Sequence, residues 1–129
     1  MADGDQPYVV PVSFGYDGQS VYFHSARDGR KLDVIAANPR VCVQFERRVA
    51  LMPSETEACE WSFAFESAIG FGVVEELRDL TSKAFGLNQI MQHYSGRSWE
   101  FDASTLARTR VWRVSIEELT GKQSGLKAP

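Results

Sequence analysis

The residues with the clearest chemical potential lie between Ser20 and Leu32, where an alternating strand pattern runs into a polar turn. The turn brings small and cationic side chains to the start of a short predicted helix: Ser25, Arg27, Gly29, Arg30 and Lys31. Glycine lets the backbone approach a ligand, the first amides of a helix lack partners within it, and lysine adds a full charge. The turn is a candidate phosphate site for a phosphorylated cofactor. The alternative is a solvated basic turn that begins a helix.

Other patterns for side-chain chemistry are missing from the sequence. There is no Ser-His-Asp order, no motif of paired carboxylates and no Walker-type loop. Cys42 and Cys59 have no CxxC partner and no neighbouring histidine, and His24 and His93 lie far apart, so no metal site is expected. Both thiols are expected to be buried and reduced, with Cys42 in the core. Any chemistry is therefore expected to come from a bound cofactor.

Size and charge limit the class of protein. A chain of 129 residues with 43% hydrophobic content is long enough for one core, so we expect a single domain over residues 1–129. The net charge of −3 and the sequence pI near 5.4 argue against a nucleic-acid-binding protein. No apolar run reaches the length of a membrane span and the first residues are polar, which makes the cytoplasm the expected location.

Two strands before the turn are predicted to form a hairpin. Tyr8–Tyr16 and Ser20–Ser25 flank Asp17-Gly18, a dipeptide typical of a two-residue loop. That loop would place Phe14 opposite Val21, Val12 opposite Phe23 and Pro11 opposite His24. One face would then belong to the core, and it carries Val10, Val12, Phe14, Val21 and Phe23. The other is semi-polar and suits a ligand wall or a subunit contact, with Pro11, Ser13, Tyr22 and His24.

The rest of the chain alternates strands with two helices. Lys31–Asn38 is predicted as a short helix that ends at Pro39, and Asp79 is predicted to cap a long helix reaching Tyr94. Another helical turn is expected after Asp102. The remaining strands are Arg40–Glu46, Trp61–Glu66, Ser67–Glu76 and Thr109–Ile116, with a loop at Arg47–Glu57 and a polar tail over 120–129. Six or more strands with one long and one short helix favour a mainly β fold, a small antiparallel barrel.

Four motifs in this order resemble a known family. They are the segment Pro7–Phe14, the segment Val21–Ala26 with Gly29–Leu32, the segment Trp61–Gly72, and Val111–Ile116 with Thr120–Lys122. The pattern is similar to the FMN-binding split barrels related to pyridoxamine 5'-phosphate oxidase, and most similar to the nitroimidazole-resistance subgroup. It covers Pro7 to about Lys122. Members normally carry a helix and a first barrel strand before the first motif, whereas only Met1–Gln6 precede it here. The expectation is either a misassigned start codon or a missing or truncated first strand.

The resemblance implies a homodimer that binds FMN in clefts at the subunit interface. The backbone of Pro11–Ser13 would lie beside the flavin ring, and Ser25, Arg30 and Lys31 would hold the phosphate. Ser67 and Trp112 would approach the flavin, and Arg113 and Lys122 would place positive charge near the ring. The full set of cofactor residues implied is Pro11, Val12, Ser13, Phe23, His24, Ser25, Ala26, Arg30, Lys31, Ser67 and Trp112.

Several of these residues have a purely structural interpretation as well. His24 is the candidate catalytic residue, and its alternative is a histidine whose ring bonds a backbone carbonyl. Lys31 could be an exposed lysine at a helix start, which the helix dipole disfavours, and Ser67 could be an ordinary serine at a strand bend. Glu75 and Glu76 are expected to be solvated charges, and His93 is expected to be structural or exposed.

The function implied is that of a flavoprotein oxidoreductase that reduces a small planar acceptor such as a nitroaromatic compound. A second hypothesis is a non-catalytic flavin- or haem-binding module with a storage, sensing or scavenging role. A third is a dimeric domain that has lost its ligand.

Overall fold

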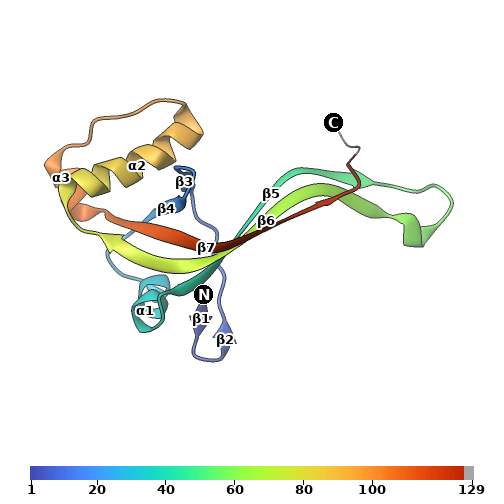
Figure 1. The fold of residues 1–129 in the computed structure, drawn as a ribbon, viewed down its shortest axis with the longest axis horizontal. Coiled ribbons are helices and arrows are strands. Elements are labelled where there is room, and N and C mark those ends of the chain that lie inside the picture. Colours follow the sequence, from blue (N-terminus) through green and yellow to red (C-terminus); the bar gives the residue numbers. More distant parts are fainter. Residues whose placement is uncertain (127–129) are drawn as a thin grey trace. The chain divides into compact units, whose positions relative to one another are not determined.

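The computed structural model describes residues 1–126 and shows a mainly β protein with an antiparallel sheet and a few helices, the class expected from the sequence (Figure 1). Residues 127–129, the end of the predicted polar tail, lie outside the described residues. The strands are β1 (Ala2–Asp3), β2 (Gln6–Pro7), β3 (Phe14–Tyr16), β4 (Ser20–Ser25), β5 (Arg40–Met52), β6 (Ser62–Leu77) and β7 (Arg110–Ser124). The helices are α1 (Arg30–Ala37), α2 (Leu80–Ser95) and α3 (Ala103–Arg108), with a 3-10 turn η1 (Ala58–Glu60).

Five strands form one sheet in the order β3-β4-β7-β6-β5, and β1 and β2 form a separate hairpin. The chain divides into two compact units, which we describe separately. The first unit contains Met1–Val41 and Gly72–Glu117, and the second contains Cys42–Phe71 and residues 118–126. Strands β5, β6 and β7 each contribute residues to both units.

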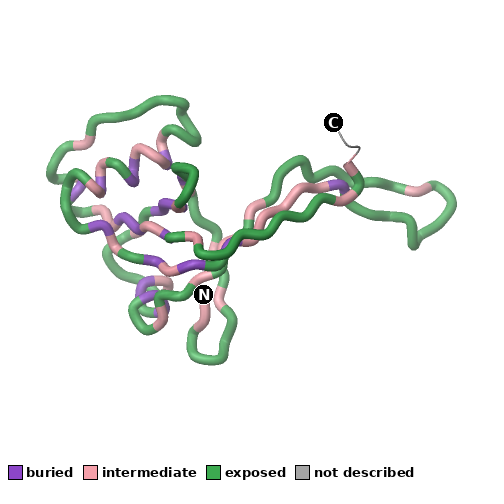
Figure 2. Tube along the Cα trace, in the orientation of Figure 1, coloured by how far each residue is buried: buried purple, intermediate pink, exposed green. Residues whose placement is uncertain are grey.

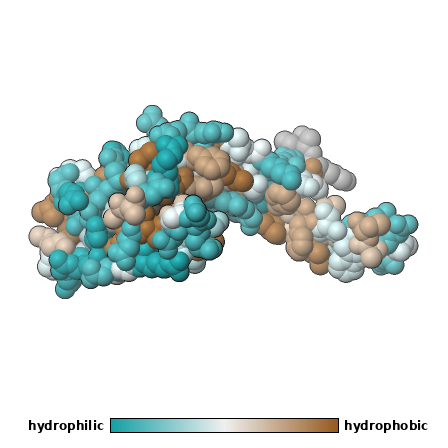
Figure 3. Space-filling model, turned by 90° about the horizontal axis from the view of Figure 1, so that it is seen from below, coloured by the Kyte–Doolittle hydropathy of each residue, from teal (hydrophilic) through white to brown (hydrophobic). Residues whose placement is uncertain are grey.

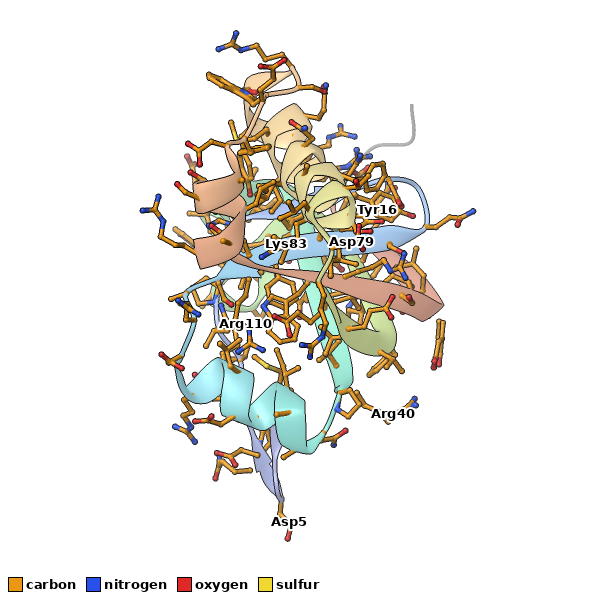
Figure 4. The ribbon with its side chains drawn as sticks, turned by 90° about the vertical axis from the view of Figure 1, so that its left-hand side faces the viewer. Asp5, Tyr16, Arg40, Asp79, Lys83 and Arg110 are labelled. Atoms are coloured by element: carbon orange, nitrogen blue, oxygen red, sulfur yellow. The ribbon has the colours of Figure 1, made fainter. Side chains whose placement is uncertain are left out.

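Helices cover both faces of the strands in the first unit, with α2 and α3 on one face and α1 on the other (Figures 1 and 4). Successive residues of a strand point to opposite faces. Tyr22 and Val111 therefore join the core cluster under α2 and α3, together with Leu77, Leu87, Ile90 and Leu106. On the opposite face, α1 buries Leu32, Val34 and Ile35. Figure 2 shows buried stretches along α1 and α2 and along the strands between them.

Tyr22 does not lie on a ligand wall or subunit contact, as the sequence predicted. Tyr22 is only 2% exposed, and its ring contacts Phe85 of α2 edge-on, with 5.7 Å between the ring centroids. The position was misjudged because a helix distant in sequence covers this face of the hairpin. Tyr22 is therefore a core residue whose hydroxyl keeps a polar partner, since it donates a hydrogen bond of 2.8 Å to Asp17.

The hairpin forms, but its register is two residues away from the predicted one. Phe14 pairs with Phe23 and Tyr16 pairs with Val21. The loop residues are Gly18 and Gln19 rather than Asp17 and Gly18, since the amide of Asp17 bonds the carbonyl of Ser20. Gly18 adopts a φ of 100°, which suits glycine at the first loop position. A shift of two residues preserves the face of every side chain, so the buried positions of Val21 and Phe23 are confirmed.

Residues upstream of β3 do not continue the strand. Residues 8–13 form no regular structure, and Val12 is 38% exposed rather than buried in the core as predicted. The hairpin that residues 1–7 form instead is held by two bonds between Met1 and Tyr8, each 2.9 Å. The segment over Pro11 and Ser13 is exposed.

Asp17 holds the hairpin turn together. Its carboxylate accepts hydrogen bonds from the amides of Gln19 and Ser20, at 2.9 and 2.8 Å, and from the hydroxyl of Tyr22. We expect Asp17→Ala to lower the free energy of unfolding by about 1–2 kcal/mol, because these bonds are lost and the phenol is left without its acceptor. Urea denaturation measures the change, and Asp5→Ala at the exposed tip of the β1–β2 hairpin is the control. Equal losses in both variants would contradict this role.

The helix boundaries agree closely with the sequence. Asp79 caps α2 by accepting a bond from the amide of Ser82, and Asp102 caps α3 through the amide of Thr105. Gly96 ends α2 in the left-handed conformation with a φ of 71°. Helix α1 spans Arg30–Ala37, one residue from the predicted Lys31–Asn38 at each end. The caps act within three residues of each helix, which is why the sequence shows them.

The strands of the second unit are longer than predicted. β5 continues to Met52 through most of the predicted loop at Arg47–Glu57, and β6 is one strand where two were predicted. β7 likewise extends into the predicted tail, to Ser124. Polar pairs across the strands accompany this extension; for example, Arg47 and Arg48 of β5 both pair with Glu66 of β6.

Both cysteines are exposed, so the prediction of buried thiols was wrong. Cys42 alternates with Val41 and Val43, which are only half-buried themselves, and it therefore lies on the outer face of β5. Cys59 lies in η1, where every residue is exposed.

Candidate cofactor site

The start of α1 is an open helix end. Gly29 is the capping residue, with a φ of 143°, and no described side chain caps this end. The carbonyl of Gly29 accepts bonds from the amides of Leu32 and Asp33, at 2.9 and 3.3 Å. The amides at the first positions of the helix therefore have no partner within it and carry the positive end of the helix dipole.

Beside this helix start lies a pair of stacked aromatic rings, which we call the Phe23–Trp112 stack. The two residues oppose each other on β4 and β7, with ring centroids 6.3 Å apart and ring planes 13° from parallel. Both are almost fully buried, at 7% and 5% exposure. The indole nitrogen of Trp112 donates a hydrogen bond of 2.9 Å to the hydroxyl of Ser25, which itself donates to the carbonyl of Ala26. Trp112 is thereby held at a fixed angle.

Lys31 belongs to the same cluster. Its ammonium nitrogen lies 5.6 Å from the ring centroid of Phe23, a distance at which the ring face attracts the cation. Phe23, Ser25, Lys31 and Trp112 are thus brought together by β4, β7 and the first turn of α1. Two buried aromatic rings, a hydroxyl, a cation and an open helix end meet at one place.

Arg30 points elsewhere. Its guanidinium pairs with Asp3 at 3.0 Å and lies 4.6 Å from the ring centroid of Tyr8. These partners belong to the N-terminal hairpin and to the residue that follows it. The role of Arg30 as a phosphate ligand stays a prediction, and this contact with Asp3 would have to open for it.

The other residues implied by the resemblance lie apart from this cluster or beside it. His24 is exposed, and it alternates with Phe23 and Ser25, so it lies on the opposite face of β4. Ala26 directly follows Ser25 and is exposed. Pro11, Val12 and Ser13 form the exposed segment before β3, and Ser67 lies in β6 within the second unit. Their roles toward a cofactor stay predictions.

An ion pair below the stack was missed by the sequence analysis. The guanidinium of Arg110 donates to both carboxylate oxygens of Glu76, at 2.8 and 3.0 Å, and to the carbonyl of Arg27 at 3.1 Å. Its central carbon also lies 4.8 Å from the ring centroid of Trp112. Figure 4 shows Arg110 between the strands and α1. Glu76 also pairs with Arg78 at 3.2 Å.

Glu76 is therefore not the solvated charge that the sequence predicted, whereas Glu75 is half exposed and close to that prediction. Glu75 accepts a bond of 2.7 Å from Arg113, which fixes one of the cations expected near the flavin. The other, Lys122, lies 5.7 Å from the ring of Phe65 in the second unit. The sequence alone does not reveal these pairs, because their partners are 34 and 38 residues apart and are brought together only by the order of the strands.

The pairing of Glu76 makes a prediction about pH. The hydrogen bonds from Arg110 lower the pKa of Glu76, against a raising effect of burial, and the charges of Arg110, Arg78 and Lys83 lower the pKa further. The pair therefore contributes stability above the unfolded pKa of about 4.3, and that contribution is lost as the pH falls through the lower folded pKa. We expect Glu76→Gln to lower the free energy of unfolding by about 1–3 kcal/mol at neutral pH, with a smaller difference at acidic pH.

Urea denaturation at a series of pH values measures this effect. Glu75→Gln is the matched control, because Glu75 forms a comparable pair that is half exposed and should contribute less. A loss in Glu76→Gln that is constant from neutral to acidic pH would contradict the assignment.

Comparison with known proteins places the chain in a family. The sequence profile of the pyridoxamine 5'-phosphate oxidase family matches residues 1–123. A candidate 5-nitroimidazole antibiotic resistance protein from Bacteroides thetaiotaomicron is 33% identical, with a TM-score of 0.78 over 90% of this chain and 68% of that chain. A FAD-binding protein from Mesorhizobium loti is 28% identical, with a TM-score of 0.65 over 96% of this chain and 82% of that chain.

A curated protein of Rhizobium meliloti is 40% identical over 40 residues, which are 31% of this chain and 26% of that protein. The chain thus spans about a quarter of this curated relative. The mainly β, antiparallel fold agrees with the family match. The chain belongs to the pyridoxamine 5'-phosphate oxidase family.

Two further findings concern the described residues only. None of their helices has the length and apolar character needed to cross a membrane. Within residues 1–126, no group of three or more histidine, cysteine, aspartate or glutamate side chains is placed to hold a metal ion.

Proposed function

We propose that this protein binds FMN beside the Phe23–Trp112 stack and acts as an oxidoreductase that reduces a small planar acceptor, with the cofactor at the interface of a homodimer. The observation that carries the proposal is the meeting of the stacked rings with the open start of α1. Family membership and the FAD-binding relative support a flavin as the class of ligand.

The residues at the start of α1 fit a phosphate ester. A phosphate takes hydrogen bonds from unpaired helix amides and is stabilised by the dipole of the helix. Gly29 has no side chain, so the backbone there is open to a ligand, and Lys31 adds a charge-assisted contact. The open helix amides and the Lys31 ammonium both favour an anionic group on the ligand. A phosphate monoester such as that of FMN provides one.

In this reaction, the protein would bind and position the cofactor. Bound FMN would supply the transfer of electrons or hydride. Phe23 and Trp112 are almost fully buried and form a rigid apolar backing next to the start of α1, and the bond from Trp112 to Ser25 holds the indole in place. The resistance protein from Bacteroides thetaiotaomicron supports a nitroaromatic compound as the class of acceptor.

The second unit supports the homodimer. Its strands carry large apolar side chains that are exposed in the single chain, among them Trp61 and Phe63 at 52% each. Others are Val49, Leu51, Met52, Phe71 and Leu119. Figure 3 shows apolar surface on this part of the molecule, and Figure 2 shows most of its chain trace as exposed or intermediate. Apolar surface of this extent is typical of an interface, and we assign it to a second copy of the chain.

The test of the function is a titration of purified protein with FMN, FAD and riboflavin, followed by flavin fluorescence. We expect FMN to bind most tightly, with riboflavin weaker because it lacks the phosphate. Binding should be followed by oxidation of a reduced nicotinamide in the presence of a nitroaromatic acceptor. Tighter binding of FAD would redirect the proposal to the dinucleotide, and no binding of any flavin would overturn it.

The test of the homodimer is light scattering after size-exclusion chromatography. We expect the mass of two chains, and the double variant Trp61→Ser/Phe63→Ser should shift the mass toward a single chain. The matched control is Trp99→Ser, which replaces a tryptophan that is also exposed but lies outside the second unit. A monomeric wild-type protein would contradict the proposal.

A further inference from the structure

A cavity of about 320 Å³ lies within the first unit, between α1 and the adjoining parts of β6 and β7. We call it the α1 cavity. Its apolar walls come from both sides, with Leu32 and Ile35 from the helix and Val74 and Trp112 from the strands. The volume is at the lower end of the range for small-molecule sites. It suits a ligand with one ring or a short branched chain.

Some charged groups that line the α1 cavity have ion-pair partners within the protein, and others have none among residues 1–126. Glu76 pairs with Arg110 and Arg78, and Glu75 pairs with Arg113, which lies outside the lining. The four lining charges Glu75, Glu76, Arg78 and Arg110 are therefore fixed in pairs within the protein wall. Arg27, Asp28 and Asp33 also line the cavity. No described residue forms an ion pair with the side chain of any of the three. Asp28 acts on Arg110 only through its charge, which raises the pKa of that guanidinium along with the larger effect of the Glu76 hydrogen bonds.

The groups left without ion-pair partners carry both signs of charge. Arg27 can bind a carboxylate with two parallel hydrogen bonds, and Asp33 or Asp28 can accept from an ammonium group. A ligand with only one charge would leave the opposite group unpaired and would bring its own charge near a group of the same sign. We propose that the α1 cavity is a binding site for a small zwitterion with an apolar body, of the kind represented by an apolar or aromatic amino acid.

This site is separate from the proposed phosphate site. Neither Ser25 nor Lys31 lines the cavity, whereas Trp112 borders both places. The inference does not depend on flavin binding, and it is tested on protein without added flavin. Because Arg110 touches both Glu76 and Trp112, a ligand in the cavity would lie against a rigid wall rather than a mobile one.

The test uses three probes that share a phenyl ring and differ in charge. They are L-phenylalanine, which is a zwitterion, phenethylamine, which is a cation, and 3-phenylpropionate, which is an anion. Calorimetric titration and ligand-observed NMR should show saturable binding of phenylalanine, at least about tenfold tighter than either singly charged probe. Equal binding of phenethylamine or 3-phenylpropionate would overturn the assignment to a zwitterion, and no saturable binding of phenylalanine would overturn the site.

Two variants on the same helix locate the binding. Ala36 lines the cavity and Ala37 does not, although both are exposed alanines of α1. We expect Ala36→Trp to abolish phenylalanine binding and Ala37→Trp to retain it, with circular dichroism reporting the fold of both. Equal binding by the two variants would overturn the location.

A third variant tests the charge of the cavity wall without changing the volume of the cavity. Asp33→Asn keeps the size of an exposed side chain and removes its charge. We expect phenylalanine to bind about tenfold more weakly to it, with the affinity for 3-phenylpropionate not lowered. A phenylalanine affinity equal to that of the wild type would overturn the role of Asp33.

Discussion

The double variant Arg30→Ala/Lys31→Ala is expected to bind FMN about 2–4 kcal/mol more weakly than the wild type, provided that both cations make charge-assisted contacts with the phosphate. That loss is about 30-fold to 1000-fold in the dissociation constant. Lys31→Ala alone should account for a large part of it, because Lys31 already lies at the Phe23–Trp112 stack. Arg30 is paired with Asp3 and must leave that pair to contribute.

Riboflavin is the control ligand for this experiment. It carries the same ring without the phosphate, so the double variant should bind it as the wild type does. Arg108→Ala, which removes an exposed cation at the end of α3, is the control variant and should leave FMN affinity unchanged. An equal loss for riboflavin and FMN would mean that the cations act on the fold or the ring, and an unchanged FMN affinity would remove the phosphate assignment.

The second large effect is expected from Gly15→Ala. Gly15 is buried in β3 against α2, and a methyl group at its Cβ position would meet the backbone of Gln89 and Ile90 far inside van der Waals contact. Backbone atoms of a helix cannot rotate away as a side chain can, so α2 or β3 must shift. We expect a loss of about 3 kcal/mol or more in the free energy of unfolding, measured by urea denaturation.

Gly121→Ala is the matched control for this prediction. Gly121 is also a strand glycine, but its added Cβ would lie 3.8 Å from the carbonyl of Ser67, an ordinary contact. This variant should be as stable as the wild type or slightly more stable, because alanine has less freedom in the unfolded chain. A stable Gly15→Ala protein would show that α2 does not pack closely on β3.

The effect of Gly15 illustrates which parts of the fold a sequence reveals. A glycine inside a predicted strand is a known sign of close backbone approach, but nothing local to Gly15 identifies the helix that approaches it. The same holds for Tyr22, whose burial depends on α2. The register error in the hairpin has a local cause, since Asp17-Gly18 and Gly18-Gln19 both provide a glycine in the loop and differ only in its position.

The candidate site was partly predictable for a similar reason. Ser25 and Lys31 lie close in sequence to the open end of α1, so the turn itself pointed to them. Trp112 entered only through the resemblance to a family, and its contact with Ser25 spans 87 residues. The α1 cavity could not be predicted, because its walls come from a helix and two strands whose order the sequence does not state.

The sequence by itself determined the helix ends, the positions of the main strands and the polar turn at the start of α1. These features depend on interactions between residues a few positions apart, such as the cap of α2 by Asp79. Only the tertiary structure decided which charges neutralise one another and which remain available. Arg30 is held by Asp3 and Glu76 by Arg110, while Arg27 faces the α1 cavity, because strand pairing and helix packing bring together residues that are distant along the chain.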